Sequence, residues 1–254
     1  MLNEFILSFD LDWAPDFVID AVAETLLKRR IKSTWFVTHD SPAVRRLFEH
    51  EGVCEIGIHP NFLSNSTHGK NEREVMNKIT KLFPKSKIIR THGLFQSTLL
   101  LKNLVKDYGI KIDVSLLLPE TANLQPHTIH FDYNKGLVRV PYFWEDDIEM
   151  NNPSKSWKIK HPKYHATGLK IFNFHPIHVF LNSSNPKRYQ NLKLQKPVYL
   201  LQENEVSPQI NKDKPGVKDL FNELCDFIST EQKGSYTISE IVEKWKDEKS
   251  ENRD

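Results

Sequence analysis

The sequence has few cysteines and no long hydrophobic run. Its two cysteines, Cys54 and Cys225, lie far apart along 254 residues, whereas a disulfide framework requires several pairs. We interpret both as small buried hydrophobic residues of a protein kept in a reducing compartment. Because no apolar stretch approaches the roughly 18 residues of a membrane helix, we expect no membrane insertion.

The chain also lacks an excess of either charge. Its 35 basic and 33 acidic residues leave a net charge of +2, and they are mixed along the chain without the basic stripe typical of nucleic-acid binders. The opening segment MLNEFILSFDLDWAPD carries acidic residues where a signal peptide needs an apolar core and a small-residue cleavage site. These features predict a cytoplasmic protein without a nucleic-acid partner.

Hydrophobic residues are plentiful enough for a large core. They make up 39% of the chain, with 15 phenylalanines and 5 tryptophans, so no covalent staple is needed. A β/α barrel commonly fills about this length as one domain. We therefore expect a single domain over residues 1–254, with a surface excursion at about 181–215 and a frayed tail at 247–254.

Short apolar runs alternate with segments of helical period, which predicts an α/β fold of repeated β/α units. Pro15 is typical of a helix start, and the spacing of the apolar residues after it predicts a helix to about Arg30. The other expected helices cover 72–83, 97–108, 217–231 and 238–246. The expected strands are 5–9, 33–38, 53–58, 88–89, 113–118, 137–143 and 169–174.

Polar residues recur where the expected strands end. The set consists of Asp10, Asp12, His39, His59, Arg90, His92, Trp144, Glu145, Asp146 and His175. In parallel β/α folds the active site forms at the carboxyl ends of the strands, because the loops converge there. We therefore expect these side chains to meet at one end of the sheet.

Asp10 and Asp12 are two residues apart on or just after a strand, so both carboxylates point the same way. Two aligned carboxylates repel each other unless a cation or a proton lies between them. We therefore favour a functional pair. The alternative is that Asp12 only caps the helix that begins at Pro15.

His59 and His68 form a second cluster in the segment IGIHPNFLSNSTHGK. His59 ends an apolar strand, and His68 follows nine residues later in a polar loop. Together with a carboxylate they would make the open three-ligand set that is typical of catalytic metal sites. The alternatives are a core histidine at position 59 and an ordinary loop residue at position 68.

Arg90 and His175 also follow apolar strands. The Arg90 guanidinium needs an anion, and Asp10 or Asp12 is the candidate partner; a purely structural ion pair is the alternative. His175, in IFNFHPIHVF, can transfer a proton near neutral pH, which favours catalysis over a core position. The role of His178 stays open.

The segment VPYFWEDD places Trp144 beside three carboxylates, those of Glu145, Asp146 and Asp147. An aromatic ring in such surroundings suits a carbohydrate platform or the packing around a catalytic histidine. The same arrangement also occurs at ordinary acidic surface turns.

The order of these motifs resembles the polysaccharide deacetylases, the NodB-homology group. An acidic pair is followed by HxxxxxxxxH, RxH, an aromatic-acidic turn and an apolar-H motif, over about residues 5–180. The segments DLDW, HPNF and FHPIH are similar to a divergent branch linked to bacterial surface polysaccharide synthesis. The resemblance implies a distorted (β/α) barrel with seven or eight strands.

The resemblance also implies a role for each residue. Asp10 would be the general base, Arg90 would tether it, and His175 would be the general acid. The ligands of one divalent metal ion would be Asp12, His59 and His68. Zinc is the expected ion, with iron, cobalt, manganese and nickel as alternatives. Because Leu11 separates the two aspartates, which are usually adjacent in the family, their roles could be exchanged.

Three further residues are expected to contact the substrate. They are Trp144 and Asp146 of the aromatic-acidic turn and His92, which replaces the family's usual proline. The substrate implied by the resemblance is an N-acylated sugar or polysaccharide, from which a metal-dependent hydrolase removes an acetyl or formyl group. The expected setting is bacterial surface polysaccharide biosynthesis.

Two other functions remain as alternatives. A different metal hydrolase, such as a phosphoesterase, would favour a carboxylate-rich site for two metal ions. A saccharide-binding barrel that has lost catalysis would have no need for the acid and base formed by His175 and Asp10.

Overall fold

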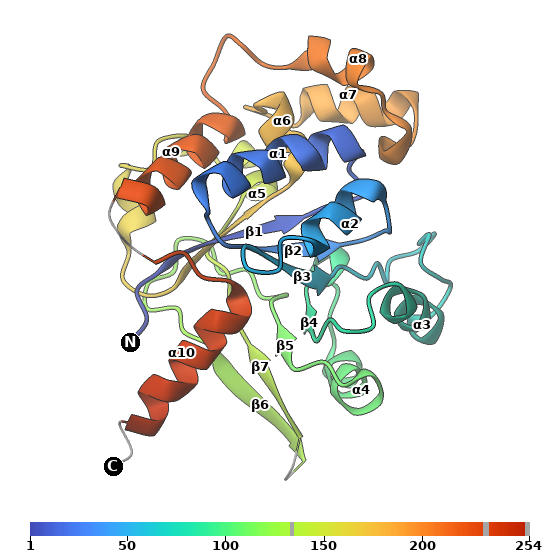
Figure 1. Ribbon diagram of the computed structural model, residues 1–254, viewed down its shortest axis with the longest axis vertical. Coiled ribbons are helices and arrows are strands. Elements are labelled where there is room, and N and C mark those ends of the chain that lie inside the picture. Colours follow the sequence, from blue (N-terminus) through green and yellow to red (C-terminus); the bar gives the residue numbers. More distant parts are fainter. Residues whose placement is uncertain (133–134, 231–233, 252–254) are drawn as a thin grey trace.

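The structure is a computed structural model that describes residues 1–132, 135–230 and 234–251. Its centre is a curled sheet of nine strands surrounded by helices (Figure 1). The strand order is β6-β7-β5-β4-β3-β2-β1-β9-β8, and among the described strands only β6 and β7 pair in antiparallel fashion. This is the distorted (β/α) barrel expected from the sequence, with nine strands in place of seven or eight.

The strands are β1 Phe5–Asp10, β2 Ser33–Val37, β3 Cys54–Ile58, β4 Ile88–Ile89, β5 Ile112–Asp113, β6 His127–Asp132, β7 Lys135–Arg139, β8 Trp144–Glu145 and β9 Lys170–Phe174. The α-helices are α1 Asp16–Arg29, α2 Pro42–Phe48, α3 Glu72–Leu82, α4 Thr98–Tyr108, α5 Asp146–Asn151, α6 Pro176–Leu181, α7 Lys187–Gln195, α8 Glu203–Val206, α9 Val217–Thr230 and α10 Ile238–Glu251. Short 3-10 helices cover His92–Leu94, Pro162–His165, Val198–Leu200 and Ser207–Gln209.

Strand β1 lies within the parallel part of the sheet, between β2 and β9. All six of its residues are buried, as expected for a parallel strand that is covered on both faces. Its Phe9 lies opposite Trp35 of β2 and Phe174 of β9. This register brings the carboxyl ends of the three strands to the same edge of the sheet.

Helix α1 shows how the local sequence fixes the chain after β1. Pro15 precedes the first turn, Asp16 places a negative charge there, and Arg30 ends the helix in the left-handed conformation with a φ of 54°. Val18, Val22 and Leu26 are buried, because residues at this spacing share the face that packs on the sheet.

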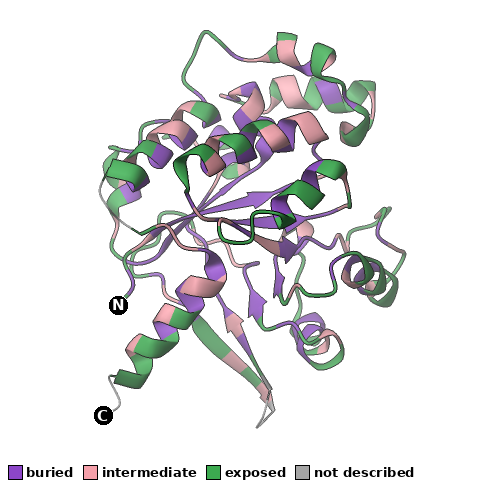
Figure 2. Cartoon of the chain, in the orientation of Figure 1, coloured by how far each residue is buried: buried purple, intermediate pink, exposed green. Residues whose placement is uncertain are grey.

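The core lies on both faces of the sheet, and strands β1, β2 and β9 are buried along their whole length (Figure 2). On one face Phe9 and Trp35 stack with their ring centroids 4.3 Å apart. On the other face Ile6, Phe36 and Tyr142 belong to a smaller cluster beneath α10. The helices and the two apolar layers therefore hold the strand ends in fixed positions.

Several segments differ from the sequence-based expectation. Residues 187–209 of the expected surface excursion contain α7 and α8. Helix α10 continues to Glu251 where a frayed tail was expected, and Lys249 lies over the Trp245 ring at 4.1 Å. The expected helix end at Glu231 and the last residues, 252–254, lie outside the described residues. No helix within the described ranges has the length and apolar character of a membrane span.

Candidate active site

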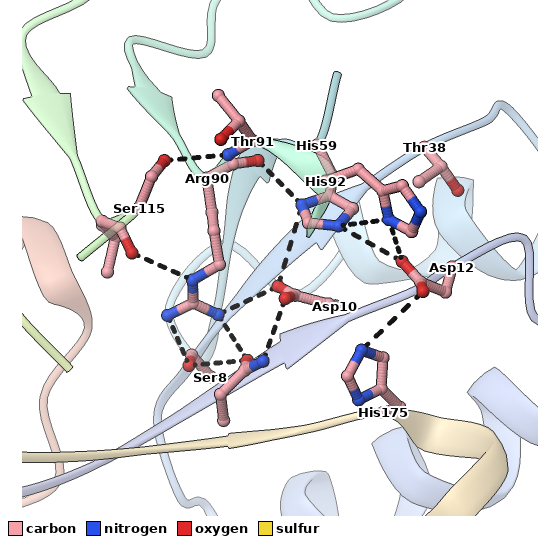
Figure 3. Close-up of polar contacts among 12 residues, drawn as sticks. Ser8, Asp10, Asp12, Thr38, His59, Arg90, Thr91, His92, Ser115 and His175 are labelled. Atoms are coloured by element: carbon pink, nitrogen blue, oxygen red, sulfur yellow. Dashed lines mark hydrogen bonds and ion pairs between the residues drawn. The ribbon is translucent and has the colours of Figure 1, made fainter. Parts of the chain in front are cut away.

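Several of the polar residues predicted at the strand ends gather at one edge of the sheet. Asp10 ends β1, His59 follows β3, Arg90 follows β4 and His175 follows β9. Figure 3 shows them pointing toward one another, with Asp12 and His92 beside them. The site therefore draws on four strands that are distant in sequence.

Asp10 lies in a pocket of hydrogen-bond donors. Its Oδ1 accepts a hydrogen bond from Arg90 Nη1 at 2.9 Å, and its Oδ2 accepts one from Asn173 Nδ2 at 2.9 Å. The side chain of Asp10 is almost fully buried. Burial alone would raise the pKa of Asp10, but the nearby Arg90 guanidinium outweighs it and the pKa is lowered. Asp10 is therefore held as a carboxylate in one orientation.

Arg90 is itself completely buried and fully occupied by partners. Its Nη2 donates to Ser8 Oγ at 3.1 Å and its Nε donates to the Val114 carbonyl oxygen at 3.2 Å. The guanidinium plane lies between the rings of Phe36 and Tyr142, 4.4 and 4.3 Å from their centroids. Such cation–π contacts favour arginine over lysine at this position.

Asp12 forms the centre of a second cluster with two histidines. Its Oδ1 lies 3.2 Å from His59 Nε2 and 3.0 Å from His92 Nδ1, and the two ring nitrogens are 3.3 Å apart. These three atoms form a nearly equilateral triangle, which Figure 3 shows beside Asp10. Burial would raise the pKa of Asp12, but the hydrogen bonds from His59 and His92 dominate and hold it well below its usual range.

The triangle has the spacing of ligands around one metal ion. Zinc binds nitrogen and oxygen atoms at about 2.0–2.1 Å in a tetrahedron, which puts neighbouring ligand atoms about 3.3 Å apart. His59 is prepared for such a role because its Nδ1 lies 2.7 Å from the Arg90 carbonyl oxygen. That contact places the proton on Nδ1 and leaves the Nε2 lone pair free.

The structure does not bring His68 into this cluster, so the expected ligand set needs a correction. His68 Nε2 lies 2.7 Å from the Thr38 carbonyl oxygen, and its Nδ1 accepts a hydrogen bond from the Asn61 backbone N–H at 3.0 Å. Both ring nitrogens are therefore occupied by the backbone. Burial lowers the pKa of His68 to about 4, so the ring is neutral. His92 takes the third position of the triangle instead.

His175 lies across the site from His59 and His92. Its Nδ1 lies 2.6 Å from Asp146 Oδ1, and its backbone N–H donates to Asp146 Oδ2 at 2.8 Å. Its Nε2 lies 3.8 Å from Asp12 Oδ2. Burial would lower the pKa of His175, but Asp146 and Asp147 outweigh it and the pKa is raised well above the ordinary value. The ring is therefore a protonated group with a fixed direction.

The expected substrate contacts of Trp144 and Asp146 also need a correction. Asp146 has no exposed surface, and its two oxygens are used by His175. Trp144 is 3% exposed and packs between Phe172 and Phe174. Asp146 therefore orients His175, and Trp144 belongs to the core beneath it. The side chain of His92 is 24% exposed, but its nitrogen faces Asp12.

A second group of metal-binding residue types consists of Glu145, Asp147 and His175. Glu145 is hydrogen-bonded to the Tyr142 hydroxyl, and burial raises its pKa to about 7. Asp147 Oδ1 lies 3.0 Å from His178 Nε2. His175 Nδ1 is held by Asp146, so each of the three residues has a partner outside the group, whereas Asp12, His59 and His92 face one another; the first triangle is therefore the better metal site.

Sequence reasoning missed Ser8 and Asn173, which complete the surroundings of Asp10. Asn173 Nδ2 binds the carboxylate, and its Oδ1 accepts hydrogen bonds from Ser8 Oγ at 3.0 Å and from Arg90 Nη1. Both residues lie inside buried strands. Each of them is a polar residue within an apolar run of the sequence. That was the available signal, because a buried polar side chain needs a hydrogen-bond partner.

A curled β/α sheet with polar residues at the carboxyl ends of its strands is the architecture of the polysaccharide deacetylase class. A family model described as WbmS-like polysaccharide deacetylase matches residues 7–193. The chain belongs to this family.

Two solved structures are similar to this chain. A protein from Bordetella bronchiseptica, described as a polysaccharide deacetylase involved in O-antigen biosynthesis, is 27% identical with a TM-score of 0.77, over 89% of this chain and 90% of that one. The peptidoglycan deacetylase PdaC from Bacillus subtilis is 12% identical with a TM-score of 0.51, over 98% and 95% of the two chains, and shares the fold. No curated protein sequence matches.

Proposed function

We propose that this protein is a metal-dependent hydrolase that removes an N-acyl group from an amino sugar of a bacterial surface polysaccharide or its precursor. The observation that carries the proposal is the pairing of the Asp12–His59–His92 triangle with two oriented proton-transfer groups, Asp10 and His175. The family and the similarity to the Bordetella bronchiseptica protein support a sugar substrate.

Asp12, His59 and His92 would hold one divalent ion, and zinc suits two imidazoles and a carboxylate. When bound, such an ion supplies a Lewis acid for the acyl group and lowers the pKa of water. His92 must then present a neutral nitrogen, so its proton leaves as the ion binds. Asp12 keeps its negative charge because its pKa is already low.

Asp10 would act as the general base. It is ionised, and Arg90 and Asn173 each occupy one position on its two oxygens, whereas a carboxylate has about four acceptor positions. A water molecule that adds to the acyl carbon would give its proton to Asp10. Arg90 and Asn173 fix the direction of that transfer, because neither can turn away from its other partners.

His175 would act as the general acid. Asp146 holds its Nδ1, so the proton on Nε2 points into the site. That proton would pass to the nitrogen of the sugar as the C–N bond breaks. The products are a free amino sugar and the carboxylic acid of the acyl group, with the water oxygen retained in the acid.

The test is amine release from N-acetylated glucosamine oligosaccharides together with elemental analysis. We expect about one divalent ion per chain, activity that is lost on chelation, and recovery when zinc is added back. The His92→Ala variant should lose the ion and the activity. The matched variant His68→Gln should keep the ion, because its ring nitrogens bind only the backbone.

The opposite pattern, with the ion lost from His68→Gln and kept in His92→Ala, would restore the ligand set expected from the sequence. Two ions per chain, with turnover of phosphate esters and no amine release, would favour the phosphoesterase alternative. Sugar binding without amine release at any metal loading would favour the saccharide-binding alternative.

A further inference from the structure

Trp13 follows the proposed ligand Asp12 and differs in exposure from the other tryptophans of the chain. Trp35, Trp144, Trp157 and Trp245 are all buried, whereas Trp13 is only half-buried. Its ring lies beside the cluster, with its centroid 5.4 Å from that of His92 and nearly perpendicular to it. A large aromatic side chain is therefore kept partly open at the mouth of the site.

The backbone makes this placement costly. Asp12 and Trp13 have φ values of 44° and 57°, the left-handed region that costs a residue with a Cβ atom about 1–2 kcal/mol. The turn is held by a hydrogen bond from the Trp13 N–H to Thr38 Oγ1 at 3.1 Å and another from the Ala14 N–H to the Leu11 carbonyl oxygen at 2.7 Å. Glycine or asparagine would adopt this conformation more easily, so the sequence retains the indole for another reason.

His68 supports the indole from the side. The two rings lie 5.3 Å apart at an angle of 41°, and the hydrogen bonds of His68 to Thr38 and Asn61 leave it no freedom to turn. The same residue, Thr38, thus holds both the backbone of Trp13 and the ring behind it. Among the described residues, the indole N–H of Trp13 has no hydrogen-bond partner, so it can donate to a ligand.

We propose that Trp13 is the platform on which the sugar ring rests and that His68 is the residue that positions it. The inference rests on the proposed function, because it takes the substrate to be a sugar. The apolar C–H face of a pyranose ring packs on an aromatic face, and the indole N–H can bind a hydroxyl or an acyl oxygen. A sugar in this place has its substituents beside Asp12 and His92, where the acyl group must lie.

The test uses the emission of Trp13 with tri-N-acetylchitotriose as the probe. Trp13 is the half-exposed tryptophan, so binding of the sugar should change the emission of the wild-type holoenzyme. The change should disappear in Trp13→Phe, which keeps an aromatic ring, although calorimetry should still detect binding. It should persist in the matched control Trp245→Phe, which removes a buried tryptophan of α10.

Steady-state kinetics distinguish the role of Trp13 as the platform from that of His68 as the residue that positions it. Trp13→Ala should raise KM and lower kcat/KM up to about 10-fold while the metal content is unchanged. His68→Ala should raise KM by a smaller factor, with kcat and the bound ion retained, and His68→Gln should recover part of the loss because it can rebuild the backbone hydrogen bonds. Circular dichroism shows whether each variant is folded.

Two results would overturn the inference. One is a wild-type emission that the sugar does not change. The other is a KM that stays the same in both Trp13→Ala and His68→Ala. Amine release without an emission change leaves the hydrolase proposal standing and removes the platform. An emission change without amine release leaves the platform standing and removes the hydrolase proposal. The two proposals can therefore fail separately.

Discussion

Asp10 and Asp12 are two residues apart, yet the fold gives them opposite surroundings. Asp10 ends a buried strand and is held by Arg90 and Asn173, whereas Asp12 lies on a left-handed turn and faces two histidines. Both carboxylates are ionised, but for different reasons: a fixed guanidinium in the first case and imidazole hydrogen bonds in the second. The comparison teaches that the partners of each carboxylate, more than its place in the sequence, set the different roles proposed for Asp10 and Asp12.

The largest expected effect comes from substituting each of the two aspartates by asparagine, which tests whether their roles differ. Asp10→Asn keeps the shape but cannot accept the proton of water, so kcat should fall about 10²- to 10⁴-fold with the ion retained. Asp12→Asn removes the negative charge of the ligand triangle, so the ion itself should bind more weakly. Elemental analysis and amine-release rates of the two variants measure both properties.

A reversed result would exchange the roles of the two aspartates, which the sequence alone allows because Leu11 separates them. In that case Asp10→Asn would lose the ion and Asp12→Asn would keep it. Full activity and full metal content in both variants would place the catalytic site elsewhere in the molecule.

Substitution of Arg90 tests how much the buried ion pair with Asp10 contributes to stability. Arg90→Leu leaves the Asp10 carboxylate buried without its cation, which typically costs about 3–5 kcal/mol in the free energy of unfolding. The double variant Arg90→Leu/Asp10→Leu removes both charges and should recover much of that loss. Urea denaturation of the two variants measures the difference. A loss of less than about 1 kcal/mol in Arg90→Leu would mean that water reaches Asp10 in solution.

Asp146→Asn tests whether the proposed general acid, His175, needs Asp146 to orient its ring. Asp146 accepts hydrogen bonds from both the backbone N–H and the Nδ1 of His175. Asparagine has one acceptor oxygen, so one of these donors loses its partner. We expect kcat to fall roughly 10- to 100-fold with the metal content unchanged. Equal kcat in the variant and the wild type would remove Asp146 from the mechanism.

Much of the fold could be predicted because apolar runs and turn residues act locally. The expected strand 88–89 agrees with β4, and 5–9 differs from β1 by one residue. The expected strand 113–118 was mostly wrong, since regular pairing covers Ile112–Asp113 and only a single bridge at Leu117 follows. Pairing with strands that are distant in sequence decides where such a strand ends. The antiparallel partner β6 was missed because its exposed positions, such as His127 and His130, carry polar side chains.

The site was predictable where a residue directly follows a strand, because the strand then fixes the direction of the side chain. Asp10, Arg90 and His175 are examples. His68 could not be placed, since its position depends on how the loop after Pro60 folds back onto Thr38. His92 was recognised as a residue facing the site, but only the distance of its Nδ1 from Asp12 shows that it can complete a ligand triangle.

The pH dependence of stability tests the neutral state of His68. Its pKa falls from the ordinary 6.5 to about 4 in the fold because of burial, so the unfolded chain takes up a proton at a higher pH than the folded protein does. The stabilising contribution of the neutral ring is therefore complete above about pH 6.5 and is lost as the pH falls toward 4. The urea midpoint should therefore drop more between pH 7 and pH 5 in the wild type than in His68→Gln. An equal drop in the two proteins would contradict the low pKa of His68.

The smallest expected effect separates the backbone of Trp13 from its ring. Trp13→Ala and Trp13→Gly both remove the indole, but only glycine adopts a φ of 57° without strain. The glycine variant should therefore be more stable than the alanine variant by about 1 kcal/mol, measured by thermal or urea unfolding. Both should bind tri-N-acetylchitotriose equally weakly, because neither offers an aromatic face. If alanine proved as stable as glycine, the turn after Asp12 would relax out of the left-handed region in the alanine variant, and a φ of 57° would impose no cost there. Retained metal in that variant would then show that the hydrogen bond from the Trp13 N–H to Thr38 Oγ1 is enough to keep Asp12 beside the histidines.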